Sequence, residues 1–312
     1  LGLPLVLFRD DQGRAAALPD RCAHRSAPLS RGRVQQGCLE CPYHGWRYNS
    51  AGECVHIPAL TGPPPRRRQL PLAALPTLER DGFIWVYPGS QALPPEPFRF
   101  PHLGESGWHS FRMVTRFPAP AFLCVENFLD CPHTVFVHQG WFRSRRTREV
   151  HARVRRGADW VEAEFAGERD AESVVSRTLF PGDQEMIHTD RFQMPAITRV
   201  DYGFGTERHF IITSQCTPVG PRETLVYTVM TYRFRRLGPL VRLFFEPLSR
   251  HVIRQDVAIL RAVADNLERF ERPGAVSLSC DLLGPQIWDM WRRARHRAPP
   301  APQGEWMAWL KF

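Results

Sequence analysis

Apolar and polar positions alternate along much of the first 90 residues. Short apolar stretches at 3–8, 15–18 and 83–86 are separated by turn-forming segments rich in glycine, proline and aspartate. A period of two with closely spaced turns is typical of short β-strands. The pattern therefore predicts a small all-β domain at the start of the chain.

A proline-rich segment at 88–101 follows, and its prolines favour extended chain over helix. We expect it to connect an N-terminal domain at 1–98 with a larger domain at 99–312. A chain of 312 residues is long enough to form two hydrophobic cores.

The larger domain is predicted to hold strands first and helices last. After a strand at 110–117, β-branched and aromatic stretches recur between glycine and proline turns. These stretches are 150–155, 160–165, 174–179, 185–193, 208–216 and 224–234. Hairpin-length gaps predict one large antiparallel sheet. A long helix is expected from about Gly238 or Ser249 to Phe270, and a second at 282–295, so the fold class is α+β.

Two short pairs of metal-binding side chains stand out in the N-terminal domain: Cys22 with His24, and Cys41 with His44. Two thiolates and two imidazoles could hold a tetrahedral zinc ion, or a [2Fe–2S] cluster in which two histidines replace two cysteines on one iron. The single residue between Cys22 and His24 favours the cluster, because zinc spacings usually start with two intervening residues. We expect both pairs at the tips of adjacent hairpins.

Charge and hydropathy narrow the classes of partner. The formal charge is +9, but Lys311 is the only lysine and the arginines are spread along the chain, so nucleic-acid binding is not expected. Dense basic clusters occur at 66–68 and 143–148, as solvated loops or as docking sites for an acidic electron donor. The sequence contains no apolar run of about 18 residues, so it predicts no membrane span. A cytoplasmic location is expected.

The cysteines and the chain start add two further expectations. Six cysteines lie outside the ligand pairs, show no paired spacing and are expected to be free, mostly buried thiols. The chain opens at Leu1 beside a predicted strand, so we expect natural residues before it.

A second group of polar side chains follows the strand at 110–117. On a regular helix of about 100° per residue, Asp130 and His133 would share a face, whereas His138 would lie about 140° from His133. A helix end or a π-type irregularity near Val135 is therefore needed if both imidazoles are to face one ion. Pro132 also predicts a distortion of the helix here.

The long C-terminal helix carries a carboxylate on its apolar face. Asp256 lies in the stripe 249, 253, 256, 260, 263, 267 and 270, which is otherwise mainly aliphatic and aromatic. A buried carboxylate is costly unless it is paired or bound to a metal ion. Asp256 is a candidate third ligand, with an ion pair to an arginine as the alternative. The rival carboxylates on less apolar stretches are Asp201, Glu246 and Asp281.

Two histidines and one carboxylate, with open positions opposite, are the ligand set of non-haem Fe(II) oxygenases. Together the motifs make this chain similar to the Rieske non-haem iron oxygenases, the oxygenase components of ring-hydroxylating and O-demethylating systems. The matching motifs are C-x-H-x16-C-x2-H, E-N-x-x-D-x2-H-x4-H and a downstream helix with Gln255-Asp256. The resemblance implies an all-β Rieske [2Fe–2S] domain and a helix-grip (START-like) catalytic domain, whose antiparallel sheet curves around a long C-terminal helix.

The resemblance also implies roles for individual residues. The cluster ligands would be Cys22, His24, Cys41 and His44. The ligands of the mononuclear Fe(II) would be His133, His138 and Asp256. Asp130 would bridge to a cluster histidine of a neighbouring subunit, with His44 favoured, and Glu126 would lie just outside the iron ligands.

The partners implied are a small organic substrate, aromatic or cyclic, O2, and a reductase or ferredoxin that passes on electrons from NAD(P)H. A head-to-tail trimer is implied, because in this family the two centres of one subunit are too far apart for electron transfer. The alternatives are an electron-transfer Rieske protein without oxygen chemistry, and a helix-grip carrier or sensor without the iron. Residues that could line the substrate pocket, or simply form core, are Phe192, Met194, Phe204, Phe210 and Tyr232.

Overall fold

The computed structural model describes residues 3–62, 72–89, 94–141, 149–166, 186–204, 208–234, 238–270 and 276–311. The chain forms two compact units, Leu1–Arg99 and Phe100–Phe312. The predicted strand at 174–179 and the basic clusters at 66–68 and 143–148 lie outside the described residues.

The first unit is built from short antiparallel strands in three small sheets. Two are hairpins, β1 (Leu5–Arg9) with β2 (Ala15–Pro19) and β7 (Thr77–Arg80) with β8 (Phe83–Val86). The third has the order β3 (Arg33–Gln35), β4 (Cys38–Glu40), β5 (Arg47–Tyr48), β6 (Cys54–His56), and a single 3-10 turn, η1 (Leu29–Arg31), precedes it. The prediction of a small all-β domain is confirmed.

The core of the first unit surrounds the beginnings of the two predicted ligand loops. Leu18, Leu29 and Tyr48 are completely buried, and Cys22 and Cys41 belong to the same cluster of buried side chains. Apolar residues of the predicted strands therefore also belong to the buried cluster that contains both cysteines.

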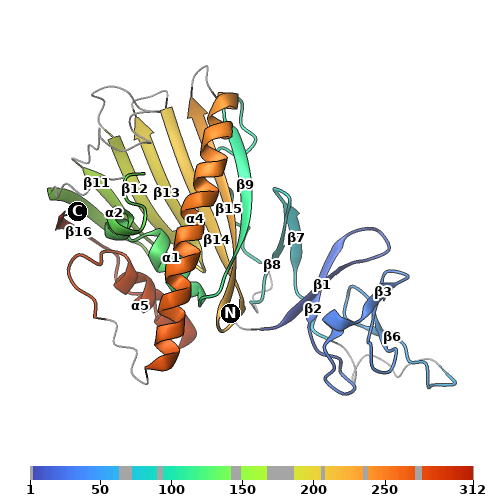
Figure 1. Ribbon diagram of the computed structural model, residues 1–312. Helices are drawn as coiled ribbons and strands as arrows, with labels where there is room; N and C mark the ends of the chain where they lie inside the picture. The colour runs from blue at the N-terminus through green and yellow to red at the C-terminus, as the bar shows by residue number, and fades with distance from the viewer. Residues whose placement is uncertain are drawn as a thin grey trace. The chain divides into compact units, whose positions relative to one another are not determined.

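The second unit is organised on one antiparallel sheet of eight strands, in the order β16-β10-β11-β12-β13-β14-β15-β9 (Figure 1). The strands are β9 (His109–Phe117), β10 (Glu149–Arg156), β11 (Trp160–Ala166), β12 (Met186–Gln193), β13 (Ile197–Phe204), β14 (Arg208–Gly220), β15 (Glu223–Phe234) and β16 (Gly304–Lys311). The predicted large antiparallel sheet is thus confirmed.

Two of these strands, β13 and β16, are absent from the prediction. Arg199, Asp201 and Gly203 interrupt the apolar pattern of β13, which forms because it pairs with β12 on one side and β14 on the other. The tail that holds β16 becomes a strand by pairing along β10. In both cases a neighbouring strand supplies backbone hydrogen bonds that local sequence does not reveal.

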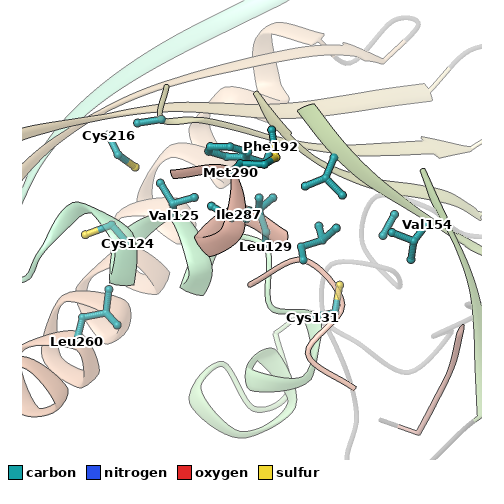
Figure 2. Close-up of a cluster of buried hydrophobic side chains, with 14 of the residues drawn as sticks. Cys124, Val125, Leu129, Cys131, Val154, Phe192, Cys216, Leu260, Ile287 and Met290 are labelled. Atoms are coloured by element: carbon teal, nitrogen blue, oxygen red, sulfur yellow. The ribbon is translucent and has the colours of Figure 1, made fainter. Parts of the chain in front are cut away.

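Helices cover one face of the sheet (Figure 1). The long α4 (Gly238–Arg269) runs across it, and α1 (Ala121–Phe128) and α5 (Gly284–Arg295) lie beside α4. Side chains of the sheet and of all three helices meet in one buried cluster, shown in Figure 2. No helix in the described ranges is both long and apolar enough to cross a bilayer.

The buried face of α4 differs from the predicted stripe at its C-terminal end. Asp256 and Leu260 are buried as expected, but the next buried residue is Ala264, and Val263, Leu267 and Phe270 are exposed. The predicted stripe repeats every 3.5 residues, whereas a straight helix turns every 3.6, so the two drift apart by about 20° per heptad.

The contribution of the shared cluster can be measured with two isoleucines. Ile287 of α5 is completely buried, whereas Ile187 of β12 is 61% exposed. We expect Ile287→Ala to lower the free energy of unfolding of the second unit by about 2–5 kcal/mol, because it leaves a cavity. Ile187→Ala is the matched control and should change it by less than about 1 kcal/mol. Equal losses in urea unfolding would contradict this assignment of the core.

Candidate metal centres

The two ligand pairs of the first unit lie in two loops of different origin. The loop from Cys41 to His44 joins β4 to β5 and is the tip of a hairpin. The loop with Cys22 and His24 follows β2 and leads into η1. The expectation of two adjacent hairpin tips is therefore wrong for the first pair, because β2 pairs with β1 and the chain must cross to another sheet.

Both loops are closed by the same backbone device. The Ser26 N–H donates to the Cys22 carbonyl at 2.9 Å, and the Gly45 N–H donates to the Cys41 carbonyl at 3.1 Å. Ser26 and Gly45 have φ of 59° and 69°. A Cβ on Gly45 would also lie 2.9 Å from Cγ of Pro58, so this turn needs glycine for conformation and for space.

The structure brings the four predicted cluster ligands together in pairs. Cys22 and Cys41 are each 2% exposed, and the ring centroids of His24 and His44 are 4.6 Å apart. His24 Nδ1 is buried without a hydrogen-bond partner, a state that is costly unless the nitrogen binds something else. Buried thiols beside such an imidazole fit a [2Fe–2S] cluster held by two cysteines and two histidines.

Tyr48 and Trp46 support this site. Trp46 is one of the residues beside His44 that carry the resemblance to Rieske proteins, whereas no sequence motif singles out Tyr48. The Tyr48 hydroxyl accepts a hydrogen bond from the Ala23 N–H at 3.2 Å and lies 3.3 Å from Cys22 Sγ. Burial, and then the neighbouring Cys22, raise the pKa of Tyr48, so the phenol stays neutral and can donate to the sulfur. The Trp46 ring stacks on His24 with centroids 4.6 Å apart.

In the second unit, Pro132 breaks the helix that would otherwise run through the predicted ligands. A continuous helix would press the proline ring against the carbonyl of Phe128, and α1 ends at that residue. Asp130 is extended, and a 3-10 turn, η2 (Cys131–His133), leads into the single-turn α2 (Thr134–Val137). The irregularity thus begins before Asp130, earlier than predicted, and α2 ends immediately before His138.

This broken path places both imidazoles against one carboxylate oxygen of α4. His138 Nε2 lies 3.0 Å and His133 Nε2 lies 3.6 Å from Asp256 Oδ1. All three candidate ligand atoms lie within 4.8 Å of one another. Asp256 is 4% exposed, and its Oδ1 is buried without a hydrogen bond of proper geometry. A cation between the three atoms would satisfy that oxygen, so the set fits a 2-His-1-carboxylate metal site.

The other ring nitrogen of each histidine, Nδ1, makes a hydrogen bond on the side of the ring away from Asp256. His138 Nδ1 lies 2.8 Å from Gln255 Oε1, and His133 Nδ1 makes a short hydrogen bond to the backbone carbonyl of Asp130. Because both partners only accept, each Nδ1 must carry a proton and donate, and each Nε2 is the ring nitrogen that faces Asp256. Such outer contacts fix the tautomer and the orientation of metal-binding histidines.

The pKa values of Asp256 and His138 depend on each other. Burial would raise the pKa of Asp256, but His133 and His138 beside it more than compensate and hold that pKa below its usual range. Burial lowers the pKa of His138, but Asp256 and Gln255 outweigh this effect and raise it. Asp256 is therefore held in the ionised form that a metal ligand needs.

Asp130 lies at the edge of this site and remains partly accessible. Its side chain is 38% exposed, and its Oδ2 lies 3.8 Å from His133 Nδ1. Burial, and the negative charges of Asp281 and Asp190, raise the pKa of Asp130, while His133 acts in the opposite direction. Burial first, and then Asp130 itself, raise the pKa of the nearby Glu126.

The rival carboxylates have other partners. Asp201 pairs with Arg199 and His209, and Glu246 with Arg242 and Arg250. Asp281 accepts the backbone N–H of Leu278 at 2.7 Å. The candidate pocket residues divide between two hydrophobic clusters, Phe192 and Met194 in one, Phe210 and Tyr232 in the other. Phe204 is buried as well.

Known proteins share both halves of this arrangement. The Rieske [2Fe-2S] domain family matches residues 1–77, and the vanillate O-demethylase oxygenase C-terminal domain family matches residues 117–297. Chlorophyllide a oxygenase of Chlamydomonas reinhardtii is 41% identical over 142 residues, or 45% of this chain and 21% of that protein. The oxygenase component of dicamba O-demethylase from Stenotrophomonas maltophilia is 39% identical over 142 residues, 45% of this chain and 41% of the relative.

A longer alignment and a solved structure cover nearly the whole chain. Protein TIC 55 of Pisum sativum is 27% identical over 91% of this chain and 51% of its own length. A crystal structure of dicamba monooxygenase bound to 3,6-dichlorosalicylic acid has the same fold, with a TM-score of 0.79 at 24% identity over 95% of this chain and 91% of that one. The chain therefore belongs to the Rieske non-haem iron oxygenases, with a C-terminal domain of the vanillate O-demethylase oxygenase type.

Proposed function

We propose that this protein is a terminal oxygenase component that hydroxylates, or oxidatively dealkylates, a small aromatic or cyclic substrate with O2. The observation that carries the proposal is the meeting of two imidazole Nε2 atoms at the buried Oδ1 of Asp256. An electron-transfer protein would need only the first unit, and a carrier would have no reason to bury an ionised carboxylate between two histidines.

Each unit has its own part in this proposal. Residues 1–98 form the Rieske domain, in which Cys22, His24, Cys41 and His44 hold a [2Fe–2S] cluster. Residues 99–312 form the catalytic domain, in which His133, His138 and Asp256 hold a mononuclear Fe(II). When bound, the cluster supplies electrons one at a time, and the iron supplies open positions for O2 and the means to oxidise a C–H bond.

The protein's own contribution at the iron site is orientation and exclusion of water. Gln255 and the Asp130 carbonyl hold the two histidine tautomers, so that both Nε2 atoms face Asp256 before any metal binds. His138 and Asp256 are 2% and 4% exposed, which keeps bulk water away from the ligands. The His133 side chain is 16% exposed, so it is the most accessible of the three candidate ligands.

Asp130 and His44 are proposed to connect the two kinds of centre. His44 is exposed on the cluster loop, and the Asp130 carboxylate is partly exposed beside His133. A carboxylate that accepts a hydrogen bond from His44 of a neighbouring subunit would join cluster ligand and iron ligand by a short path. This requires a head-to-tail ring of subunits, for which a trimer is the proposed state.

The substrate class is proposed from the names of relatives. Besides dicamba O-demethylase, they include toluene-4-sulfonate monooxygenase of Comamonas testosteroni and aminopyrrolnitrin oxygenase of Pseudomonas fluorescens. Each of these three names contains an aromatic compound, which supports an aromatic substrate here. We further predict that a reductase or ferredoxin is the electron donor and passes on electrons from NAD(P)H. A cytoplasmic location is also a prediction.

Metal content and O2 consumption test the proposed function. Anaerobically purified protein should hold about three irons per chain, two in the cluster and one mononuclear. With a surrogate reductase, a panel of aromatic acids and aryl ethers should contain a compound that triggers O2 uptake. Asp256→Asn should remove the mononuclear iron and substrate-dependent uptake but keep the visible spectrum of the cluster. Asp265→Asn, an exposed change on the same helix, is the matched control.

One iron site only, or uptake that survives Asp256→Asn, would contradict an oxygenase with two centres.

The role of Gln255 as an orienting residue can be separated from its place on the helix. Gln255→Leu removes the acceptor of His138 Nδ1 and should weaken Fe(II) binding by about 10–100-fold, measured by titration of the iron-depleted protein. The neighbouring Arg254 is exposed, so Arg254→Leu is the control and should leave the affinity unchanged. Equal affinities of the two variants would refute the role of Gln255.

Asp130→Asn tests the connection between centres. The variant keeps the backbone carbonyl that holds His133, so both centres should remain loaded and spectroscopically intact. Turnover should fall by about 10²-fold or more, because electrons should pass poorly from the cluster to the iron when an amide replaces the bridging carboxylate. Asp281→Asn removes a neighbouring negative charge and serves as the control. Unchanged transfer from the reduced cluster, followed by rapid mixing, would exclude a bridging role.

A further inference from the structure

A second set of metal-binding side chains lies outside both centres described above. Cys131 Sγ is 2.9 Å from Asp190 Oδ2, and His188 Nε2 is 3.1 Å from Asp190 Oδ1. One candidate ligand atom from each residue lies within 4.8 Å of the other two. All three residues are buried, with exposures of 6%, 1% and 2% for Cys131, His188 and Asp190. Neither the oxygenase reaction nor the cluster uses any of them.

This set and the proposed iron site lie on different sides of η2. A 3-10 helix turns about 120° per residue, so Cys131 and His133 point about 120° apart. His133 contacts Asp256 of α4, whereas Cys131 contacts Asp190 of β12. Cys131 also belongs to the buried cluster between helices and sheet (Figure 2). The two ligand sets therefore cannot share one ion, although they share one turn of chain.

The charge of Asp190 requires compensation. The carboxylate is almost fully buried, and in the described part of the chain its ion-pair partner is His188 and no arginine or lysine pairs with it. Buried carboxylates are found paired with cations or bound to metals, because an uncompensated charge in the interior is costly. A divalent cation held by the Asp190 carboxylate and a Cys131 thiolate would make the site neutral overall.

The imidazole of this set is held firmly in place. The His188 ring stacks between Phe165 and Tyr202, with centroid distances of 4.7 Å and 4.5 Å and interplanar angles of 17° and 14°. His188 and Asp190 are two residues apart on β12, so both side chains point to the same face of the sheet. Strand β12 thus supplies two candidate metal ligands, and η2 supplies the third.

We propose that Cys131, His188 and Asp190 form a second mononuclear site, which takes a borderline-soft divalent cation, best matched by Zn²⁺. Thiolate, imidazole and carboxylate are the three ligand types of protein zinc sites, and a thiolate favours zinc over the hard cations that prefer oxygen. On binding, the thiol proton passes to solvent and the sulfur–zinc bond forms, with no change of oxidation state. The bound ion ties the turn that carries Asp130 and His133 to the sheet.

Zinc-edge X-ray absorption on the whole protein tests the site without reference to oxygenase activity. Mononuclear metals are removed anaerobically, the intact cluster is verified by its visible spectrum, and Zn²⁺ alone is added. The wild type should bind about two zinc ions per chain, one of them in the iron site, and should show zinc–sulfur scattering at about 2.3 Å. Cys131→Ser should bind about one and lose that scattering, although its hydroxyl can still donate to Asp190.

A second variant and a matched control keep the test decisive. Asp190→Asn should lose the same zinc ion, and the zinc retained in the iron site and thermal unfolding report whether the second unit folds. Cys124→Ser changes another fully buried thiol of the same cluster and should keep both zinc ions. A wild type without zinc–sulfur scattering, or scattering that survives in Cys131→Ser, would overturn the proposal and leave a hydrogen-bonded group with a charged His188.

Discussion

The buried carboxylate of Asp256 imposes the constraint on which the second unit depends. An ionised group at 4% exposure must meet compensating groups, and in the described chain its ion-pair partners are His133 and His138. Neither histidine is near Asp256 in sequence, so the long helix, the sheet beneath it and the broken segment between α1 and α2 must all be in place for the three atoms to meet. The site is therefore a product of the whole domain.

The break at Pro132 converts an unfavourable spacing into a usable one. Two histidines five residues apart would diverge on a regular helix, but a 3-10 turn followed by one α-turn lets the two rings approach to 5.2 Å between centroids. The same break frees the Asp130 carbonyl to hold His133, and it exposes the Asp130 side chain. One proline thus serves ligand geometry, tautomer control and the proposed route for electrons.

The η2 turn joins the proposed iron site to the proposed zinc site. One side of the turn presents His133 to α4, and the other presents Cys131 to β12. A turn this short has few hydrogen bonds of its own, so its orientation depends on what its side chains bind. In the first unit the cluster loops are held differently. Tight backbone turns at Ser26 and Gly45 close them, and their cysteines pack in the hydrophobic core.

The sequence by itself determined the ligand candidates, the all-β start, the large sheet and the long helix, because short motifs and periodic apolar patterns are local properties. It also singled out Asp256 as an out-of-place carboxylate on an apolar stripe. Only the tertiary structure decided where the helix breaks, that Gln255 orients His138, and that Cys131 meets His188 and Asp190. Strands β13 and β16 likewise depend on neighbours. Contacts between distant segments arise from packing and pairing, which no local pattern records.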